Sequence, residues 1–127
     1  MPKKMIRSPK VAATSLPLSQ ATQAGNVLYI SGAVAFNVQG EIVGKGDIRA
    51  QTQQVLENIK ALVETGGGTL RDVTQTTVYL TDLANSTGMN EVYRTYFAVD
   101  PPARATVRVD LGHPDFLVEI SATAVIG

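Results

Sequence analysis

Two charged side chains in the last quarter of the chain have types and a spacing that could serve catalysis. Arg104 follows Pro101-Pro102 closely, and the restricted backbone of this pair gives the guanidinium a defined direction. A guanidinium can bind a carboxylate through two N–H groups, so Arg104 suits a small carboxylic acid. Glu119 comes 15 residues later and could hold and activate a water molecule. Together they predict an anion-binding group beside a general acid/base.

Other residues exclude several kinds of chemistry. The chain has no Cys, which rules out thiol catalysis, disulfides and thiolate zinc sites. Because His113 is the single His, a metal would need carboxylates for nearly all its ligands, so we expect no metal site and no Ser-His-Asp triad. Residues 66–68 are all Gly, but no Lys-Ser or Lys-Thr follows them as in a phosphate-binding loop. We expect this run to end a helix.

The composition indicates one folded domain over residues 1–127, with 44% hydrophobic and 17% charged residues. The formal net charge is zero, which argues against the broad electrostatic attraction that nucleic-acid and anionic-membrane binders use. The basic start leads into no apolar signal region, and no run approaches the roughly 18 apolar residues of a membrane helix. We therefore expect a cytoplasmic protein.

The elements that must position the two charged side chains follow from periodicity. Residues 27–34 predict a strand, in which Gly32 indicates a bulge or a close backbone approach, and residues 42–43 predict a brief second strand. Apolar residues at helical spacing then predict an amphipathic helix with Asp47 as its N-cap. Gly66 should end that helix.

The second half of the chain continues the alternation of strands and helices. Residues 73–80 predict a strand and residues 89–97 a helix, and residues 104–109 and 116–126 predict two more strands. The predicted order is β-β-α-β-α-β-β. This is an α+β fold in which a sheet carries two helices on one face.

Alternation along the last two strands predicts which side chains share a face. If Ala105, Val107 and Val109 face the helices, the outward face carries Arg104, Thr106, Arg108, Glu119 and Ser121. Such a face is often simply solvated, and an Arg–Glu pair on it contributes under about 1 kcal/mol. By the same parity the face also holds Tyr79, Leu117 and Val125. This mixture leads us to infer that a partner subunit covers it.

Six segments carry motifs of a known protein family. They are PLSQA at 17–21, AGNVLYISGAV at 24–34, the segment from GDIRAQ to YLTDL at 46–83, MNEVYRTYF at 89–97, PPARATVRV at 101–109 and VEISATAV at 118–125. With these segments the chain resembles the Rid family, the YjgF-type enamine/imine deaminases. The resemblance covers nearly all of the chain from PLSQA onward, and PPARATV with the later VEI is its most diagnostic part.

The resemblance implies a fold, an assembly and an activity. Members have a chorismate-mutase-like fold and form homotrimers, in which the sheets build a central barrel with three clefts between subunits. They hydrolyse reactive enamines and imines, such as 2-aminoacrylate and related 2-imino acids, to 2-keto acids and ammonia. They use neither a metal nor an organic cofactor.

The resemblance also implies roles for individual residues. Arg104 matches the arginine that clamps the substrate carboxylate, and Glu119 matches the glutamate that positions the attacking water. Ser31 matches a serine that lines the pocket, and Asn90 an asparagine near the cleft. The other implied contacts are Gly32, as a point of close backbone approach, and backbone groups of Ala105 and Thr106.

Two departures from the family pattern bear on the substrate. PLSQ at 17–20 stands where many members have Pro-Tyr-Ser-Gln, so Leu18 removes a hydroxyl and makes the pocket more apolar. RAT at 104–106 stands where many have Arg-Ser-Cys or Arg-Ser-Thr. We expect an imine with a bulkier or more hydrophobic side chain than 2-aminoacrylate.

Two other functions stay open on the sequence. Because the tyrosine is missing, the same cleft could hold a 2-keto acid without turnover, in a sensing or partner-binding trimer. The family has also been described as endoribonucleases that inhibit translation. Neutral charge, a single His and few aromatic residues argue against nucleic acid as the partner here.

Overall fold

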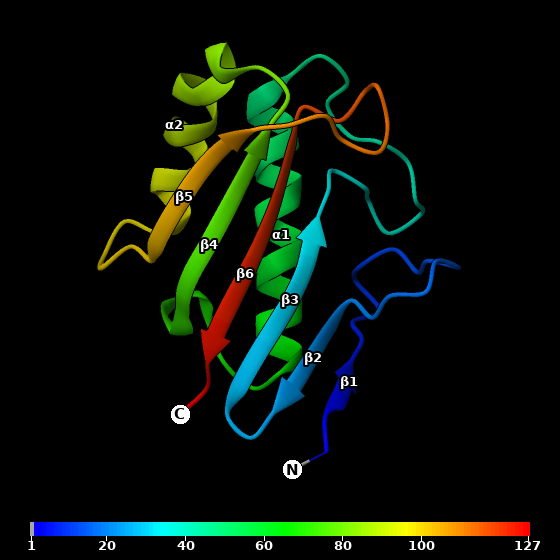
Figure 1. Cartoon of the computed structure of the whole chain (residues 1–127), viewed down its shortest axis with the longest axis vertical. Coiled ribbons are helices and arrows are strands. Elements are labelled where there is room, and N and C mark those ends of the chain that lie inside the picture. Colours follow the sequence, from blue (N-terminus) through cyan, green and yellow to red (C-terminus); the bar gives the residue numbers. More distant parts are fainter. Residues whose placement is uncertain (1) are drawn as a thin grey trace.

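Six strands form one mixed sheet, and two α-helices pack behind it in the view of Figure 1. The structure, a computed structural model, describes residues 2–127, so the first residue of the predicted domain lies outside it. The strand order is β1-β2-β3-β6-β4-β5, and neighbours are antiparallel except β4 and β5. The predicted α+β fold, a sheet with two helices, is confirmed.

The elements have the following bounds. The strands are β1 (Lys4–Ile6), β2 (Ala21–Ala24), β3 (Val27–Ala33), β4 (Val73–Leu80), β5 (Ala103–Arg108) and β6 (Val118–Val125). The α-helices are α1 (Ile48–Thr65) and α2 (Ser86–Tyr96), and short 3-10 turns at Leu70–Asp72 and Leu83–Asn85 lead into β4 and α2. Neither α-helix of the described chain has the apolar length that spanning a bilayer requires.

Three strands precede α1, whereas the sequence predicts two. β1 and β2 pair at one edge of the sheet, but with three and four residues they are too short to show the apolar alternation that marks a strand. The strand predicted at residues 42–43 is wrong, because the structure has only an isolated bridge between Phe36 and Ile42 there.

α1 begins and ends where the sequence predicts. Asp47 is the N-cap, and its Oδ1 accepts a hydrogen bond of 3.1 Å from the amide of Ala50. At the other end the amide of Gly66 donates to the carbonyl of Leu62. Gly67 takes the left-handed conformation with a φ of +96°, which turns the chain away from the helix axis.

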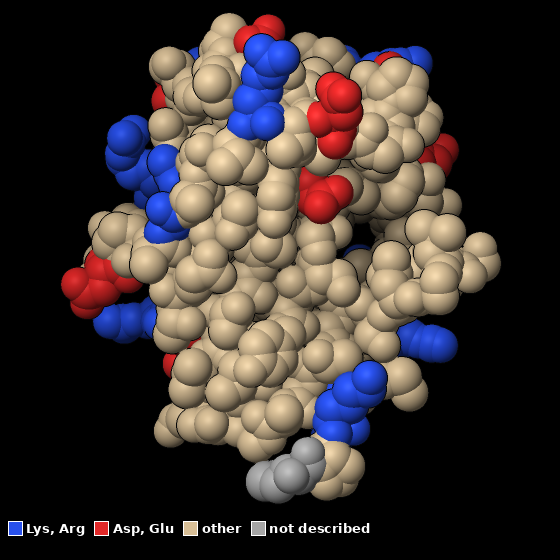
Figure 2. Space-filling view, in the orientation of Figure 1, with Lys and Arg blue, Asp and Glu red and all other residues tan. Residues whose placement is uncertain are grey.

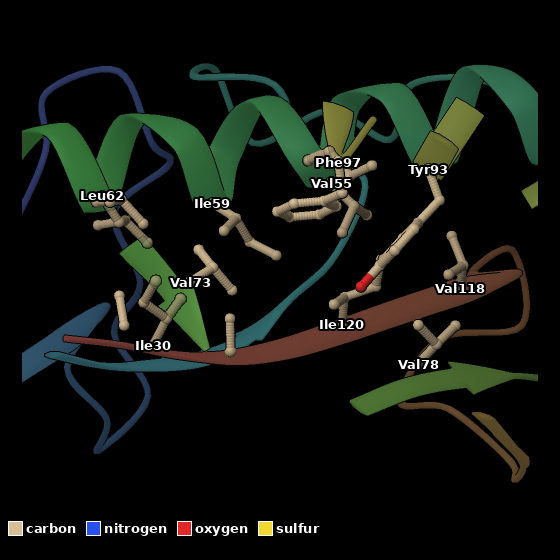
Figure 3. Close-up of a cluster of buried hydrophobic side chains, with 14 of the residues drawn as sticks. Ile30, Val55, Ile59, Leu62, Val73, Val78, Tyr93, Phe97, Val118 and Ile120 are labelled. Atoms are coloured by element: carbon tan, nitrogen blue, oxygen red, sulfur yellow. The ribbon is translucent and has the colours of Figure 1, made fainter. Parts of the chain in front are cut away.

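The core lies between the sheet and the helices (Figure 3). Its largest fully buried apolar side chains are Leu28, Leu56, Ile59, Leu80, Met89 and Ile120. A polar pair also crosses this layer, since the hydroxyls of Thr76 in β4 and Tyr93 in α2 are 2.7 Å apart. Each hydroxyl satisfies the other inside the core, and the pair ties α2 to the sheet.

The face predicted for the side chains of β5 is wrong. Arg104 pairs in register with Thr76, which is fully buried under α2, so Arg104 lies on the helix side of the sheet. By alternation Thr106 and Arg108 lie on this side too, and Ala105 and Val107 lie on the opposite side. The side chains of β5 alternate between the two faces as predicted, but each lies on the face opposite to the predicted one.

The inversion follows from the place of β5 at the sheet edge. The guanidinium of Arg104 lies over the ring of Tyr93 in α2, and the residue is exposed to solvent at the sheet edge. An arginine can therefore take an inward position there that the sequence assigns to Ala and Val.

The face of the sheet opposite the helices is poor in charge. In Figure 2 this face is toward the viewer, and Lys and Arg lie around its margin, away from the centre over β3, β6 and β4. Apolar or aromatic side chains are exposed on it, with Tyr29 at 52%, Val107 at 38% and Val125 at 39% of their surface. Apolar exposure of this kind is typical of an interaction surface, and its cover by a partner subunit stays a prediction.

Gln51 joins the first turn of α1 to the segments that flank the sheet. Its fully buried side chain donates from Nε2 to the carbonyls of Asp115 at 2.8 Å and Gly44 at 3.2 Å. Its Oε1 accepts from the amide of Leu117 at 2.9 Å. The residue thereby fixes the segment that leads directly into β6.

We expect Gln51→Ala to lower the free energy of unfolding by about 3 kcal/mol, because it leaves several buried backbone groups without partners. Urea unfolding at one protein concentration measures the loss. Gln53→Ala, on the exposed side of the same helix, is the matched control and should change stability by less than about 0.5 kcal/mol. Equal losses for the two variants would contradict the role of Gln51.

Candidate active site

Four of the predicted site residues line one cavity of about 260 Å³ beside the end of β3. They are Leu18, Ser31, Gly32 and Glu119. Figure 2 shows an opening at this place, between the end of β3 and the loop that joins β1 to β2. Residues far apart in the sequence therefore meet here, as the predicted site requires.

Gly32 lets the side chain of Glu119 approach the backbone of β3. The pairing of β3 with β6 shifts register between Ile30 and Ala33, which is a β-bulge. A Cβ at position 32 would lie 2.7 Å from Cδ of Glu119, so a larger residue would displace the carboxyl group. Both expectations for Gly32, a bulge and a close approach, are confirmed.

Two polar side chains of this cavity, those of Glu119 and Ser31, have distinct properties. Burial raises the pKa of the Glu119 carboxyl above its ordinary value. Such a carboxyl holds its proton closer to neutral pH, which favours a group that takes and returns a proton. The hydroxyl of Ser31 donates to the carbonyl of Ser19 at 2.6 Å, so its oxygen is left to accept a hydrogen bond.

Arg104 lies in a second group of residues, with Asn90 and Tyr93 of α2. Its Nη1 donates to Oδ1 of Asn90 at 2.8 Å, and its Cζ lies 4.8 Å from the ring centroid of Tyr93 in a cation–π contact. Pro101 and Pro102 line the same shallow surface. The guanidinium is oriented on one side and exposed on the other, where it can bind an anion.

The two groups lie on opposite faces of the sheet within one chain. Tyr79 pairs with Glu119 in β6 and with Val107 in β5, so Glu119 and Val107 share the face opposite the helices. Arg104 is out of phase with Val107 and faces α2. The prediction that Arg104 and Glu119 share a face is therefore wrong for a single chain. Backbone groups of Ala105 and Thr106 follow Arg104 and stay predicted contacts.

His113 lies outside the group around Arg104. Its Nδ1 accepts a hydrogen bond of 3.0 Å from the amide of Asp115, and its ring packs 5.4 Å from the ring of Phe116. These contacts hold the turn before β6. Within residues 2–127 no three His, Asp or Glu side chains are grouped as a metal site would need.

The family model of endoribonuclease L-PSP matches residues 8–126. The chain belongs to this family, the Rid or YjgF family. The family resemblance in the sequence is thereby confirmed, over almost the whole chain.

Solved structures of Rid proteins are similar over their full lengths. RidA of the Antarctic bacterium Psychrobacter is 38% identical, with 97% of this chain and 99% of that chain covered and a TM-score of 0.90. YyfA of Yersinia pestis, also of the Rid family, is 35% identical, with 98% and 100% covered and a TM-score of 0.93. E. coli TdcF, solved with bound serine, is 32% identical, with 98% and 99% covered and a TM-score of 0.91.

Sequence reasoning missed several residues of this Rid site. Tyr93 is not among the predicted site residues, but it is three residues after Asn90 and so lies on the same side of α2, beside Arg104. The spacing of three residues from Asn90 is a signal in the sequence that Tyr93 lies beside the site. No local sequence pattern marks Phe36 and Asn58, which line the far wall of the cavity, because they belong to different parts of the fold.

The raised pKa of Glu119 predicts a pH-dependent effect on stability. The folded state binds the Glu119 proton more tightly than the unfolded chain does. The stability that the protonated carboxyl contributes is therefore fully present below about pH 4 and is lost as the pH rises through the folded pKa. Glu119→Gln should therefore raise Tm relative to wild type at pH 7, and the difference should vanish toward pH 4. Thermal unfolding across this pH range measures it, with the exposed Glu41→Gln as control. A lower Tm of Glu119→Gln at pH 7 would contradict the desolvation of this carboxyl.

Proposed function

We propose that this Rid protein hydrolyses 2-imino acids and their enamine tautomers to 2-keto acids and ammonia, in clefts shared by two copies of the chain. The observation that carries the proposal is the position of Arg104 and Glu119 on opposite faces of one sheet. Because the two groups cannot reach one substrate within a single chain, the proposed cleft takes Arg104 from one copy and Glu119 from another. A homotrimer with cyclic symmetry would contain three such clefts.

The chemistry of the shared cleft needs water as the second reactant and no cofactor. Arg104 of one copy pairs with the substrate carboxylate and orients the imine. Glu119 of the other copy takes a proton from water while the water oxygen bonds to the imine carbon, and it gives that proton to the nitrogen. The proton of the new hydroxyl then passes to the nitrogen, the C–N bond breaks and the carbonyl forms. The products are one 2-keto acid and one ammonia.

The environment of each group supports its proposed role. The Asn90 contact and the Tyr93 ring orient the guanidinium before a ligand arrives, which lowers the entropy lost on binding. The bulge at Gly32 brings the Glu119 carboxyl against the backbone at the mouth of the cavity. Its raised pKa suits a group that must carry a proton between water and nitrogen.

Ligand binding without turnover is the second candidate function. TdcF was solved with bound serine, an amino acid whose carboxylate resembles that of the proposed substrate. A binding protein would need Arg104 but no proton transfer by Glu119. Glu119→Gln separates the two functions, because hydrolysis would be lost in the enzyme while 2-keto acid binding would be kept in either case.

We expect Arg104→Ala to lower kcat/KM for imine hydrolysis at least about thirtyfold, since losing a paired, desolvated carboxylate contact costs about 2–5 kcal/mol. The imine is generated by an amino-acid oxidase and trapped with semicarbazide, and the protein competes with the trap. Arg108→Ala, four residues along the same strand and exposed, is the control and should keep the wild-type rate. Full activity of Arg104→Ala would refute the proposed anchor.

Mixed assemblies test whether the cleft is shared. Arg104→Ala and Glu119→Gln chains should each be inactive, yet refolding them together should restore about a quarter of wild-type activity, because random cyclic assembly leaves that share of clefts with both native residues. Replacing the Glu119→Gln chain by one that carries both substitutions is the control and should restore none. Mixed oligomers without recovered activity would place the whole site within one chain.

A further inference from the structure

The cavity beside Glu119 continues well beyond the atoms that the proposed hydrolysis uses. From Ser31 and Glu119 its lining runs past the bulge of β3 to Leu62 on α1. Phe36 and Phe116 form one wall, with their rings in an edge-to-face contact at 5.2 Å between centroids. We call this inner part, lined by Ala12, Phe36, Leu62 and Phe116, the apolar arm.

Asn58, a polar side chain that borders the apolar arm, already has hydrogen-bond partners within the protein. The amide nitrogen of Asn58 donates to the carbonyls of Val34 at 3.1 Å and Phe36 at 3.0 Å, and its oxygen accepts from Gln54 at 2.9 Å. These bonds leave little capacity for a polar ligand group. A ligand that enters the arm is therefore recognised by apolar contact.

Gln20, on the loop side of the cavity, is satisfied in the same way. Its Oε1 accepts from the amide of Ser8 at 2.8 Å, and its Nε2 donates to the carbonyl of Ala12 at 3.2 Å. The loop that closes the arm is thus held to the sheet by a side chain that lies in the wall. Polar recognition is concentrated at the other end, at Glu119.

The size of the cavity limits the ligand. About 260 Å³ lies below the volumes typical of drug-sized ligands, so it suits one small metabolite. With the reacting carbon near Glu119, a single amino-acid side chain would extend into the arm.

We propose that the apolar arm binds the side chain of the substrate, and that the preferred substrates are 2-imino acids with a large branched aliphatic or aromatic side chain. This inference rests on the proposed function. It goes beyond the replacement at Leu18, because 52% of the surface of Leu18 is exposed, whereas Leu62 and Phe116 of the arm are buried.

The test compares imines of increasing size in the semicarbazide competition assay. For wild type we expect kcat/KM to be at least tenfold higher for the leucine- and phenylalanine-derived imines than for the alanine-derived one, as apolar contacts in a hydrophobic pocket give. Ala12→Leu narrows the arm and should lower kcat/KM for the large imines roughly tenfold more than for the small imine. Ala13→Leu, on the exposed neighbouring residue, is the matched control and should change neither.

Equal rates for small and large imines in wild type would overturn the inference, as would an equal effect of Ala12→Leu on both. If Ala12→Leu does not fold, as judged by thermal unfolding, the order of the wild-type rates decides. If no imine is hydrolysed, the proposed function fails, and calorimetric binding then decides the inference separately. Tighter binding of 4-methyl-2-oxopentanoate than of pyruvate would support the apolar arm, and equal binding would overturn it.

Discussion

The packing of α1 against the sheet is the constraint on which the candidate site depends. Its inner side buries apolar residues, and two amides on the same side, Gln51 and Asn58, are two turns apart. Gln51 holds the segment before β6, and Asn58 holds the end of β3. One helix therefore fixes both strands that carry Ser31, Gly32 and Glu119, and the geometry of the site follows from core packing.

The second constraint is the one-sided cover of the sheet. Both helices pack on the same face of the sheet. Neighbouring side chains of β5 alternate between this face and the opposite one, so they lie in different environments. Arg104 is oriented by the cation–π and hydrogen-bond contacts of α2, and Val107 belongs to the apolar opposite face. Under the proposed function, each chain carries two halves of a site, and association between copies would bring complementary halves together.

Much of the fold follows from the sequence, since the caps of α1 and the apolar content of β3, β4 and β6 are strong local signals. β1 and β2 escape prediction because their stability comes from pairing and not from their own composition. Which face each side chain of β5 takes could not be derived, because at this edge strand the guanidinium of Arg104 contacts α2 where alternation assigns an apolar residue. Motif resemblance located the residues of both halves, but the wall of the cavity depends on contacts between distant elements that no local pattern encodes.

The place of β6 in the sheet has a consequence for how the chain acquires its structure. β6 is the final strand of the sequence, yet it lies between β3 and β4 at the centre of the sheet. During synthesis, therefore, β3 and β4 each keep an unpaired edge until residues 118–125 emerge from the ribosome. The antiparallel unit β1-β2-β3 and the parallel unit β4-α2-β5 can each pair their strands earlier. The nascent chain must stay soluble while its sheet is in two separate parts. Glu119 becomes ordered when β6 joins these parts.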